Sequence, residues 1–401
     1  MAGTNMHPSE EILCTKSSKL RGKTIIMGIT GSVAAIECFA TIRELVRHGA
    51  KVIPVMSDEA QSIVTPTSLE FASGIAPVTK ITGRAEHVSM LGDGSVADLF
   101  LIYPATANTI SKIANGIDDT PVTTMATVAM GSGVPMVIAP AMHDSMFRNP
   151  AVQKNVEQLK KYGVMFLGPN VVDLRAKAVS KEEVIAWVFR LMSKNDLKEK
   201  KVLVIGGRSE EPIDSMRFIT NRSTGRMAVQ IAERAFERGA DVELWMGGCS
   251  VPLPNYMPLK RFETVSDLMK MVSKIKHDVV IVPAALADFM PAKAKKGKIP
   301  SGGTAKLDLI PVPKVLPAIR AKCSKVIGFK AESGLERDAL IAKARARMEE
   351  HDLSAIVAND IDVAGKTTSN VVIVRKGSEK DVSGTKANVA DSILDVCAEI
   401  L

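Results

Sequence analysis

The chain has 401 residues, of which 46% are hydrophobic and 24% are charged. This length exceeds what a single hydrophobic core usually holds, so we expect a soluble globular protein with two domains. The net charge of +8 comes from dispersed lysines and arginines rather than one basic stripe, and only 4% of the residues are aromatic. Composition therefore favours small anionic substrates such as phosphates and argues against nucleic-acid binding.

The sequence gives no sign of a membrane segment or of a disulfide framework. No apolar run approaches the roughly 20 residues needed to span a bilayer. Residues 1–22 are polar and lack the apolar core of a signal peptide, so we expect an arm or a short helix lying on the body. The five cysteines are scattered without a CxxC pair, which is typical of a cytoplasmic protein and of neither a zinc site nor a disulfide scaffold.

Short β-branched runs alternate with helical patterns along the whole chain. In the first half we predict strands at 24–29, 51–56, 98–103, 135–140 and 164–167, with helices at 32–48 and 149–162. In the second half we predict strands at 201–205, 241–246, 278–283, 325–329, 355–358 and 370–375. Nearly apolar strands separated by helices indicate a parallel sheet covered on both faces.

The sequence therefore predicts an α/β protein made of two doubly wound, Rossmann-like domains. A polar, charged stretch at 191–200 separates the two halves and is followed at once by a new apolar strand. We predict an arm at 1–22, a first domain at 23–190, a linker at 191–200 and a second domain at 201–401.

In such sheets ligands bind at the carboxyl ends of the strands. The first strand is followed by Gly31, which permits a tight turn, and by Ser32, which can cap the next helix and present its N–H groups to an anion. An ordinary strand–helix turn is the alternative. The turn matches neither the dinucleotide fingerprint nor a phosphate-binding loop with lysine.

The later strand ends of the first half carry small, hydroxyl or amide residues. Ser57 follows the second strand, Pro-Ala-Thr-Ala-Asn at 104–108 follows the third, and Pro-Ala-Met-His at 140–143 follows the fourth. This set suits a phosphate and a flat polar ring better than it suits a metal.

Residues 23–190 resemble the homo-oligomeric flavin-containing cysteine decarboxylases, and phosphopantothenoylcysteine decarboxylases in particular. The resemblance implies that FMN is oxidised and reduced during decarboxylation, and that His87 is the catalytic base. Without it, a lone histidine is more often structural. The residues that it assigns to FMN are Gly31, Ser32, Ser57, Pro104, Ala105, Thr106 and Asn108.

Two positions depart from this family. His143 stands where the family commonly has asparagine, and it can still donate a hydrogen bond to a substrate carboxylate. The stretch 169–180 lacks the cysteine that protonates the intermediate in bacterial forms. Lys177 or a water could replace it; Arg175 and Lys177 could instead clamp the substrate phosphate, or the stretch is a solvated loop.

In the second half a long insert separates the first strand from its helix, which we expect to begin near Ser223. Gly206 and Gly207 allow the backbone to approach a ligand closely, and a plain surface loop is the alternative. Pro-Ile-Asp-Ser-Met-Arg at 212–217 and Ile-Thr-Asn-Arg-Ser-Thr-Gly-Arg-Met at 219–227 resemble phosphopantothenate–cysteine ligases. The resemblance implies that Asn221 stabilises an acyl-nucleotide intermediate.

The same resemblance assigns the nucleotide site. Asp288 would bind the nucleotide or its Mg²⁺, Lys298 would neutralise the triphosphate, and Phe329 would flank the base. The family's two further lysines are replaced here by Pro300 and Ser301, so Lys295 and Lys296 are candidate substitutes. The nucleotide-binding residues implied are Gly206, Pro283, Ala284, Ala285, Asp288, Lys298, Phe329, Lys343 and Arg347, the last two sharing one helix face.

Taken in this order, the two resemblances imply a bifunctional enzyme of coenzyme A biosynthesis. It would join 4′-phosphopantothenate to cysteine with CTP and Mg²⁺, then decarboxylate the product with FMN, and nothing in the sequence separates CTP from ATP. They also imply a homo-oligomer, with trimeric contacts of the flavin domain and dimeric contacts of the ligase domain. The alternatives are a ligase with an altered flavin domain and a non-catalytic regulatory flavoprotein; an NAD(P) reductase is disfavoured.

Overall fold

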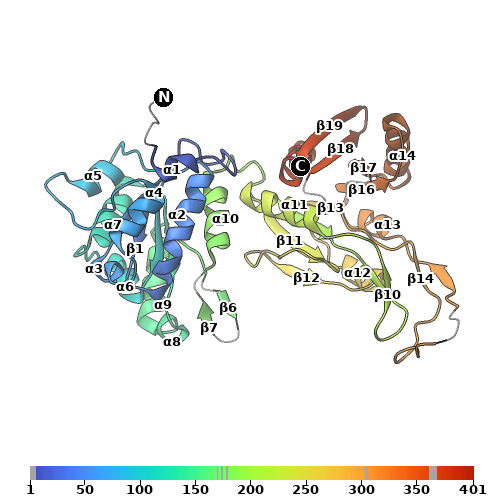
Figure 1. Ribbon diagram of the computed structural model, residues 1–401, viewed down its shortest axis with the longest axis horizontal. Helices are drawn as coiled ribbons and strands as arrows, with labels where there is room; N and C mark the ends of the chain where they lie inside the picture. Colours follow the sequence, from blue (N-terminus) through green and yellow to red (C-terminus); the bar gives the residue numbers. More distant parts are fainter. Residues whose placement is uncertain (1–5, 169, 173–174, 178, 303–305, 361–367) are drawn as a thin grey trace. The chain divides into compact units, whose positions relative to one another are not determined.

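The computed structural model describes residues 6–168, 170–172, 175–177, 179–302, 306–360 and 368–401, with backbone alone at 170–172, 175–177 and 360. The chain forms two compact units, residues 1–192 and 193–401, which are coloured blue to green and green to red in Figure 1. Each unit is an α/β layer structure built on its own sheet, as the sequence predicted.

The first unit contains a five-stranded parallel sheet in the order β2-β1-β3-β4-β5. Its strands are almost entirely buried, because helices cover both faces and side chains of opposite faces enter two separate apolar cores. The strands are β1 (Thr24–Ile29), β2 (Lys51–Met56), β3 (Leu99–Ala105), β4 (Met136–Pro140) and β5 (Met165–Phe166).

The helices of the first unit divide between the two cores. The longer ones are α2 (Cys38–Arg47), α4 (Pro66–Ser73), α6 (Ala107–Ala114), α7 (Pro121–Ser132), α9 (Pro150–Lys161) and α10 (Lys181–Met192). The shorter elements are the 3₁₀ helix η1 (Val33–Glu37), α1 (Pro8–Glu11), α3 (Asp58–Gln61), α5 (Glu86–Leu91), α8 (Asp144–Phe147) and the hairpin β6 (Asn170–Val172)–β7 (Arg175–Lys177). Because the strand order reverses between β1 and β3, the crevice at their carboxyl ends is the expected ligand site.

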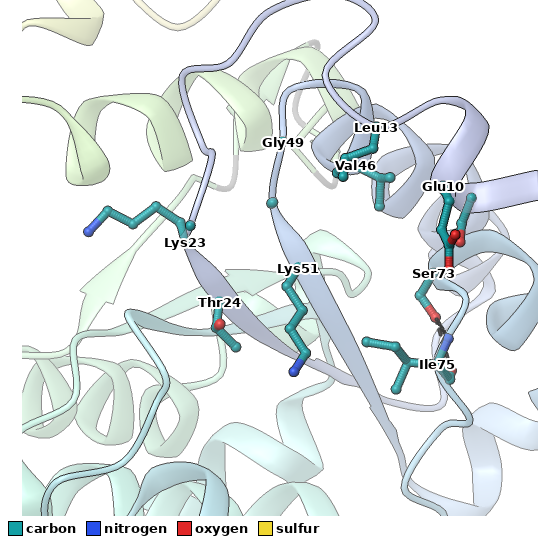
Figure 2. A pocket seen from close by; sticks show the side chains of 12 residues that line it. Glu10, Leu13, Lys23, Thr24, Val46, Gly49, Lys51, Ser73 and Ile75 are labelled. Carbon is teal, nitrogen blue, oxygen red and sulfur yellow. Dashed lines mark hydrogen bonds between the residues drawn. The ribbon is translucent and has the colours of Figure 1, made fainter. Parts of the chain in front are cut away.

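The described part of the N-terminal segment lies on the first unit. Leu20 is fully buried in one of its cores, and the Cys14 N–H donates to the Val46 carbonyl at 3.3 Å. Together with the amino ends of β1 and β2, α1 borders a cavity of about 310 Å³, near which Lys23 and Lys51 lie (Figure 2). This cavity lies at the amino ends of the strands, whereas the expected ligand site lies at their carboxyl ends.

The second unit contains an eight-stranded sheet in the order β12-β11-β8-β13-β16-β17-β18-β19. The first six strands are parallel to one another. β18 is antiparallel to β17, and β19 is antiparallel to β18. Only Lys376 and Gly377 separate β18 from β19, which is too short for a crossover to a parallel strand. The strands are β8 (Lys201–Gly206), β11 (Asp241–Met246), β12 (Leu259–Arg261), β13 (Val279–Val282), β16 (Val326–Glu332), β17 (Ala355–Asp360), β18 (Thr368–Arg375) and β19 (Ser378–Thr385).

Helices again flank this sheet. On one side, α12 (Val265–Val272), α13 (Val315–Arg320) and α14 (Arg337–Glu350) share an apolar core with β8, β13 and β16. Elsewhere α11 (Arg226–Glu237) packs against α15 (Lys386–Ile400). Two short hairpins, β9 (Glu210–Pro212)–β10 (Phe218–Thr220) and β14 (Phe289–Pro291)–β15 (Leu309–Pro311), complete the unit.

Within the described residues, none of the helices combines the length and the apolar character needed to cross a bilayer.

Candidate active sites

In the first unit, the ends of β1 and β3 are joined by a buried threonine. Thr30 donates through its hydroxyl to the Pro104 carbonyl at 2.8 Å and accepts from the Thr106 N–H at 3.0 Å. The Ala141 N–H in turn donates to the Ala105 carbonyl at 2.9 Å. The strand ends predicted to hold a flavin are thus fixed to one another before any ligand binds.

The turn after β1 differs from the prediction in its detail. A Cβ added at Gly31 would lie 2.5 Å from Cβ of Glu59, so the backbone passes close to α3 and only glycine fits. Ser32 does not cap an α-helix: its hydroxyl makes no capping bond, because η1 intervenes and α2 begins only at Cys38. The half-buried Ser32 hydroxyl is therefore available to a ligand.

The remaining predicted flavin residues lie at the same edge of the sheet. Ser57 is buried after β2 and accepts from the Ala60 N–H at 3.3 Å, which leaves its O–H as a donor. Thr106 caps α6, and Asn108 is exposed in the first turn of that helix. The set of small residues and hydroxyl and amide groups fits a phosphate and a polar ring, as expected for FMN.

His143 caps α8 at the end of β4. Its Nδ1 accepts from the Ser145 N–H at 3.3 Å, so in the neutral ring the proton is on Nε2, which can donate. The hairpin strand β7 packs beside α8. Lys177 is in β7, but its side chain and that of Arg175 lie outside the described residues.

Within one chain, His87 does not lie at the carboxyl ends of the strands, where the predicted FMN residues are. His87 is on α5, whose Leu91 carbonyl accepts from the hydroxyl of Ser132 at the C-terminal end of α7. That end adjoins the amino end of β4, and Figure 1 places α5 near the top of the first unit and α8 near its bottom. The His87 ring is half-buried, and its buried Nδ1 has no hydrogen-bond partner among the described residues.

In the second unit, three glycines form a close approach at the end of β8. A Cβ at Gly206 would lie 2.0 Å from Cβ of Ala228 in α11, and Gly207 has φ +80° with the Gly248 carbonyl 2.8 Å from its ideal Cβ. Gly225, at φ +76°, precedes α11, which begins at Arg226 rather than near Ser223. Glycine has no capping side chain, and the Arg226 N–H donates to the Thr224 hydroxyl at 3.4 Å, so the following N–H groups, of Met227 and Ala228, are the ones left to face an anion.

Asn221 is tied to the loop after β13. Its Nδ2 donates to the Ala285 carbonyl at 3.1 Å and to the Leu286 carbonyl at 3.0 Å. Both amide protons are therefore used, and the carbonyl oxygen Oδ1 is the group left to face a ligand. These bonds place Asn221 beside Ala285 and Leu286, in the loop that also carries Pro283 and Ala284.

A clamp made by Asp214 and Arg217 holds the loop that carries Lys298. Oδ2 of Asp214 accepts from the Ile299 N–H at 3.0 Å and from the Arg217 Nη2 at 2.7 Å, while the same Nη2 donates to the Ile299 carbonyl at 2.6 Å. The Lys295 N–H also donates to the Ile213 carbonyl at 3.0 Å. Hydrogen bonding from the Ile299 N–H lowers the pKa of Asp214 below its usual range. Lys298 itself is exposed.

A cluster of cations surrounds Asp288 beyond β13. Lys314 Nζ lies 2.8 Å from the Asp288 Oδ1, and this bond, with the charges of Lys314, Arg347 and Lys330, lowers the pKa of Asp288. Lys330 and Lys343 both pair with Glu332, at 2.8 and 3.2 Å. Four cations against two carboxylates leave a positive excess that suits a polyphosphate.

The structure thus groups Asp288, Lys343 and Arg347, and Phe329 is half-buried in the middle of β16. The Arg347 Nε is buried and has no hydrogen-bond partner in the described part of the chain. Sequence reasoning missed Lys314 and Lys330. Lys314 gave no signal, because it precedes a short helix 26 residues beyond Asp288. Lys330 lies within a segment noted only for its phenylalanine.

Two family models cover nearly the whole chain. The model described as Flavoprotein matches residues 13–193, and the model described as DNA/pantothenate metabolism flavoprotein C-terminal domain matches residues 197–401. The Coenzyme A biosynthesis bifunctional protein CoaBC of Thermococcus kodakarensis is 42% identical, over 99% of this chain and 100% of that protein. The protein of the same description from Methanocaldococcus jannaschii is 34% identical, over 97% of each chain.

The chain belongs to the CoaBC family. It is a bifunctional enzyme of coenzyme A biosynthesis, with a flavoprotein decarboxylase domain followed by a ligase domain, as the sequence predicted. A solved C-terminal domain of a CoaBC protein is similar at 28% identity, covering 52% of this chain and 98% of that one with a TM-score of 0.43. The FMN-dependent cysteine decarboxylase SpaF is similar at 32% identity, covering 41% and 94%, with a TM-score of 0.37.

Proposed function

We propose that this CoaBC-family enzyme condenses 4′-phosphopantothenate with cysteine at the second sheet and decarboxylates the product at the first. The observation that carries the proposal is that one chain contains two candidate ligand sites, each at the carboxyl ends of the strands of its own sheet. The first site carries hydroxyl and amide groups for a flavin, and the second carries the N-terminus of α11 beside a cation cluster.

In the ligase step, the substrate carboxylate attacks the α-phosphate of CTP and pyrophosphate leaves, which gives an acyl-cytidylate. The cysteine amine then attacks the acyl carbon and CMP leaves as the amide forms. The protein's contribution is to position the reactants and neutralise charge. Lys298, Lys343 and Arg347 would neutralise the triphosphate, while Asn221 would orient the acyl phosphate from the loop after β13.

Mg²⁺ would bind through Asp288 and phosphate oxygens of the nucleotide, since Mg²⁺ commonly uses one or two carboxylates together with substrate phosphates. The described residues contain no group of three or more acidic, histidine or cysteine side chains that could hold a metal without substrate. Lys314 pairs with Oδ1 of Asp288, so an ion that binds at this oxygen would have to displace it.

In the decarboxylase step, FMN when bound supplies the oxidation of the cysteinyl thiol that allows CO₂ to leave. Gly31, Ser32, Ser57, Pro104, Ala105, Thr106 and Asn108 would hold it. His143 would donate from Nε2 to the substrate carboxylate. Lys177 on β7 is the candidate to protonate the intermediate in place of the cysteine found in bacterial forms.

His87 would act as the base from a neighbouring subunit. The support is its position on α5 at the edge of the sheet opposite to the FMN cradle, combined with a buried ring nitrogen that has no described partner. A base that reaches the cradle only from a second chain requires a homo-oligomer. We propose trimeric contacts through the flavin domain and dimeric contacts through the ligase domain.

The test is turnover by the purified full chain with 4′-phosphopantothenate, cysteine, Mg²⁺ and either CTP or ATP, with products resolved by mass. We expect a yellow protein that forms phosphopantetheine with CTP and loses ligase activity when Mg²⁺ is removed. Accumulation of phosphopantothenoylcysteine would leave only the ligase and refute the first-domain mechanism. Absence of both products with either nucleotide would refute the ligase step, since the decarboxylase would then receive no substrate.

A further inference from the structure

The helices α11 and α15 run parallel, with their N-termini side by side. Arg234 Nε lies 3.8 Å from Asp391, and Arg238 Nη1 lies 2.9 Å from Asp395, so the two helices advance in the same direction along their contact. The same register aligns Lys386, the first residue of α15, with Val229, so the N-terminus of α15 lies within one turn of Arg226, the first residue of α11. Two aligned helix dipoles therefore direct their positive ends to one place.

Neither cation at this place is neutralised. Arg226 and Lys386 form no ion pair and their side chains donate no hydrogen bond within the described ranges, whereas the cations further along the same helices are all paired with carboxylates. Lys386 is only 8% exposed. Burial lowers its pKa, and the neighbouring charge of Arg226 lowers it further. A buried lysine facing another cation is unfavourable unless a ligand supplies the negative charge.

The backbone adds donors to the same place. Gly225 has no side chain to cap α11, whose Arg226 N–H donates to the Thr224 hydroxyl at 3.4 Å and whose next two N–H groups stay open. The Thr385 hydroxyl caps α15 by accepting from the Asn388 N–H at 3.2 Å and leaves the N–H groups of the first two residues open. The N-terminus of α15 also lies at the ligand edge of the sheet, because Thr385 pairs with Thr368 at the start of β18, just beyond the carboxyl end of β17. Convergent N–H groups and two cations are the features of a phosphate site.

We propose that Arg226 and Lys386, at the adjoining N-termini of α11 and α15, bind a phosphate group of a ligase substrate. That the phosphate belongs to a ligase substrate rests on the proposed function, whereas the capacity of this place to bind a phosphate is argued from the geometry alone. The phosphate is supplied either by the triphosphate of the nucleotide or by the phosphate of 4′-phosphopantothenate. The C-terminal helix thereby becomes part of the ligase site.

The test measures dissociation constants of the full chain by calorimetry for pyrophosphate, CTP, 4′-phosphopantothenate and pantothenate. Lys386→Gln keeps most of the buried stem but removes the charge, and Lys376→Gln removes an exposed charge from the β18–β19 turn at the opposite edge. Loss of one charged hydrogen bond weakens binding by about 10- to 100-fold. We expect that loss for pyrophosphate with Lys386→Gln and no loss with Lys376→Gln.

The ligands separate the two sources and the two hypotheses. A matching loss for CTP alone assigns the site to the nucleotide, and a loss for 4′-phosphopantothenate but not pantothenate assigns it to the second substrate. If pyrophosphate binds through Lys386 but neither substrate binds wild-type protein, the subsite stands and the ligase proposal fails. Unchanged pyrophosphate affinity, or no pyrophosphate binding to the wild type, overturns the subsite.

Thermal unfolding distinguishes a binding role from a structural one. Because Arg226 repels Lys386 when no ligand is bound, Lys386→Gln should melt at or above the wild-type temperature without ligand, and pyrophosphate should raise its melting temperature less. A lower melting temperature without ligand, together with unchanged stabilisation by pyrophosphate, would mean that Lys386 only supports the fold. Arg226→Gln repeats the test from the other helix if the first variant fails to fold.

Discussion

Replacing Asp214 by asparagine should release the loop that carries Lys298. The wild-type Oδ1 accepts from the N–H groups of Met216 and Arg217, each at 2.8 Å, so the amide oxygen of the variant is expected to take that place. The new NH₂ group then faces three donors, the Ile299 N–H and the Arg217 Nε and Nη2, which the wild-type Oδ2 accepts at 3.0, 3.1 and 2.7 Å. All three bonds are lost and donors oppose one another.

The expected effect is large and local. A hydrogen bond to a charged group contributes roughly tenfold to an equilibrium, and of the three lost bonds only that from the Ile299 N–H joins Asp214 to the loop, so opening of the loop should rise about tenfold. Amide hydrogen exchange of peptides covering 293–300 measures this opening directly. In turnover, the ligase kcat should fall because Lys298 is no longer held near the triphosphate, while decarboxylation of supplied phosphopantothenoylcysteine should be unchanged.

Asp308→Asn is the matched control, since Asp308 is exposed close to the same loop and lies 3.6 Å from the Lys306 ammonium. It should change neither exchange nor kcat. Exchange at 295–299 within about twofold of the wild type in the Asp214 variant would refute the clamp.

Three further outcomes follow from the packing and charges of the second unit. Gly206→Ala should destabilise the ligase unit by about 1–3 kcal/mol in denaturant unfolding, because its Cβ would overlap that of Ala228 at 2.0 Å. Burial raises the pKa of Glu233 to about 7, so the folded state binds this proton more tightly than the unfolded chain, and the resulting stabilisation is lost as pH rises from about 4.5 to 7. Over that range the free energy of unfolding of Glu233→Gln should rise by roughly 3 kcal/mol relative to the wild type. That of the control Glu349→Gln, at an exposed position, should not change relative to the wild type. Lys314→Met should free the Asp288 carboxylate and remove one cation, so CTP affinity measured without Mg²⁺ should fall about tenfold while Mg²⁺ dependence shifts to lower ion concentrations.

Each of these outcomes can fail in a specific way. Wild-type stability of Gly206→Ala would mean that α11 can move away from β8 without cost. A pH-independent difference for Glu233→Gln would mean that this carboxyl titrates normally. Unchanged CTP affinity in Lys314→Met would place Lys314 outside the nucleotide site.

The sequence predicted the sheet strands well where they are apolar and buried. The predicted runs at 24–29, 51–56 and 241–246 match β1, β2 and β11 residue for residue, because buried parallel strands read as continuous hydrophobic segments. It missed β19, whose residues Ser378–Thr385 are mostly exposed and polar on the edge of the sheet. A short turn at Lys376 and Gly377 was the available signal for that hairpin.

The candidate sites were less predictable than the strands because they depend on contacts between distant segments. Asp288 was identified from its motif, but its partner Lys314 is known only once β14 and α13 are placed. Ser32 was expected to cap a helix, and the intervening 3₁₀ turn removes that role. The position of His87 away from the flavin cradle could not be read from spacing, because spacing does not show at which edge of the sheet α5 packs.

The most direct test of two separate active sites in one chain is a mass-resolved comparison of His87→Asn and Asn221→Asp. With 4′-phosphopantothenate, cysteine, Mg²⁺ and CTP, we predict that His87→Asn accumulates phosphopantothenoylcysteine, whereas Asn221→Asp forms little of it yet decarboxylates it when it is supplied. Mixing the two variants should restore phosphopantetheine formation. If either variant loses both steps while remaining folded, the two chemistries do not reside in separate sites and the account is contradicted.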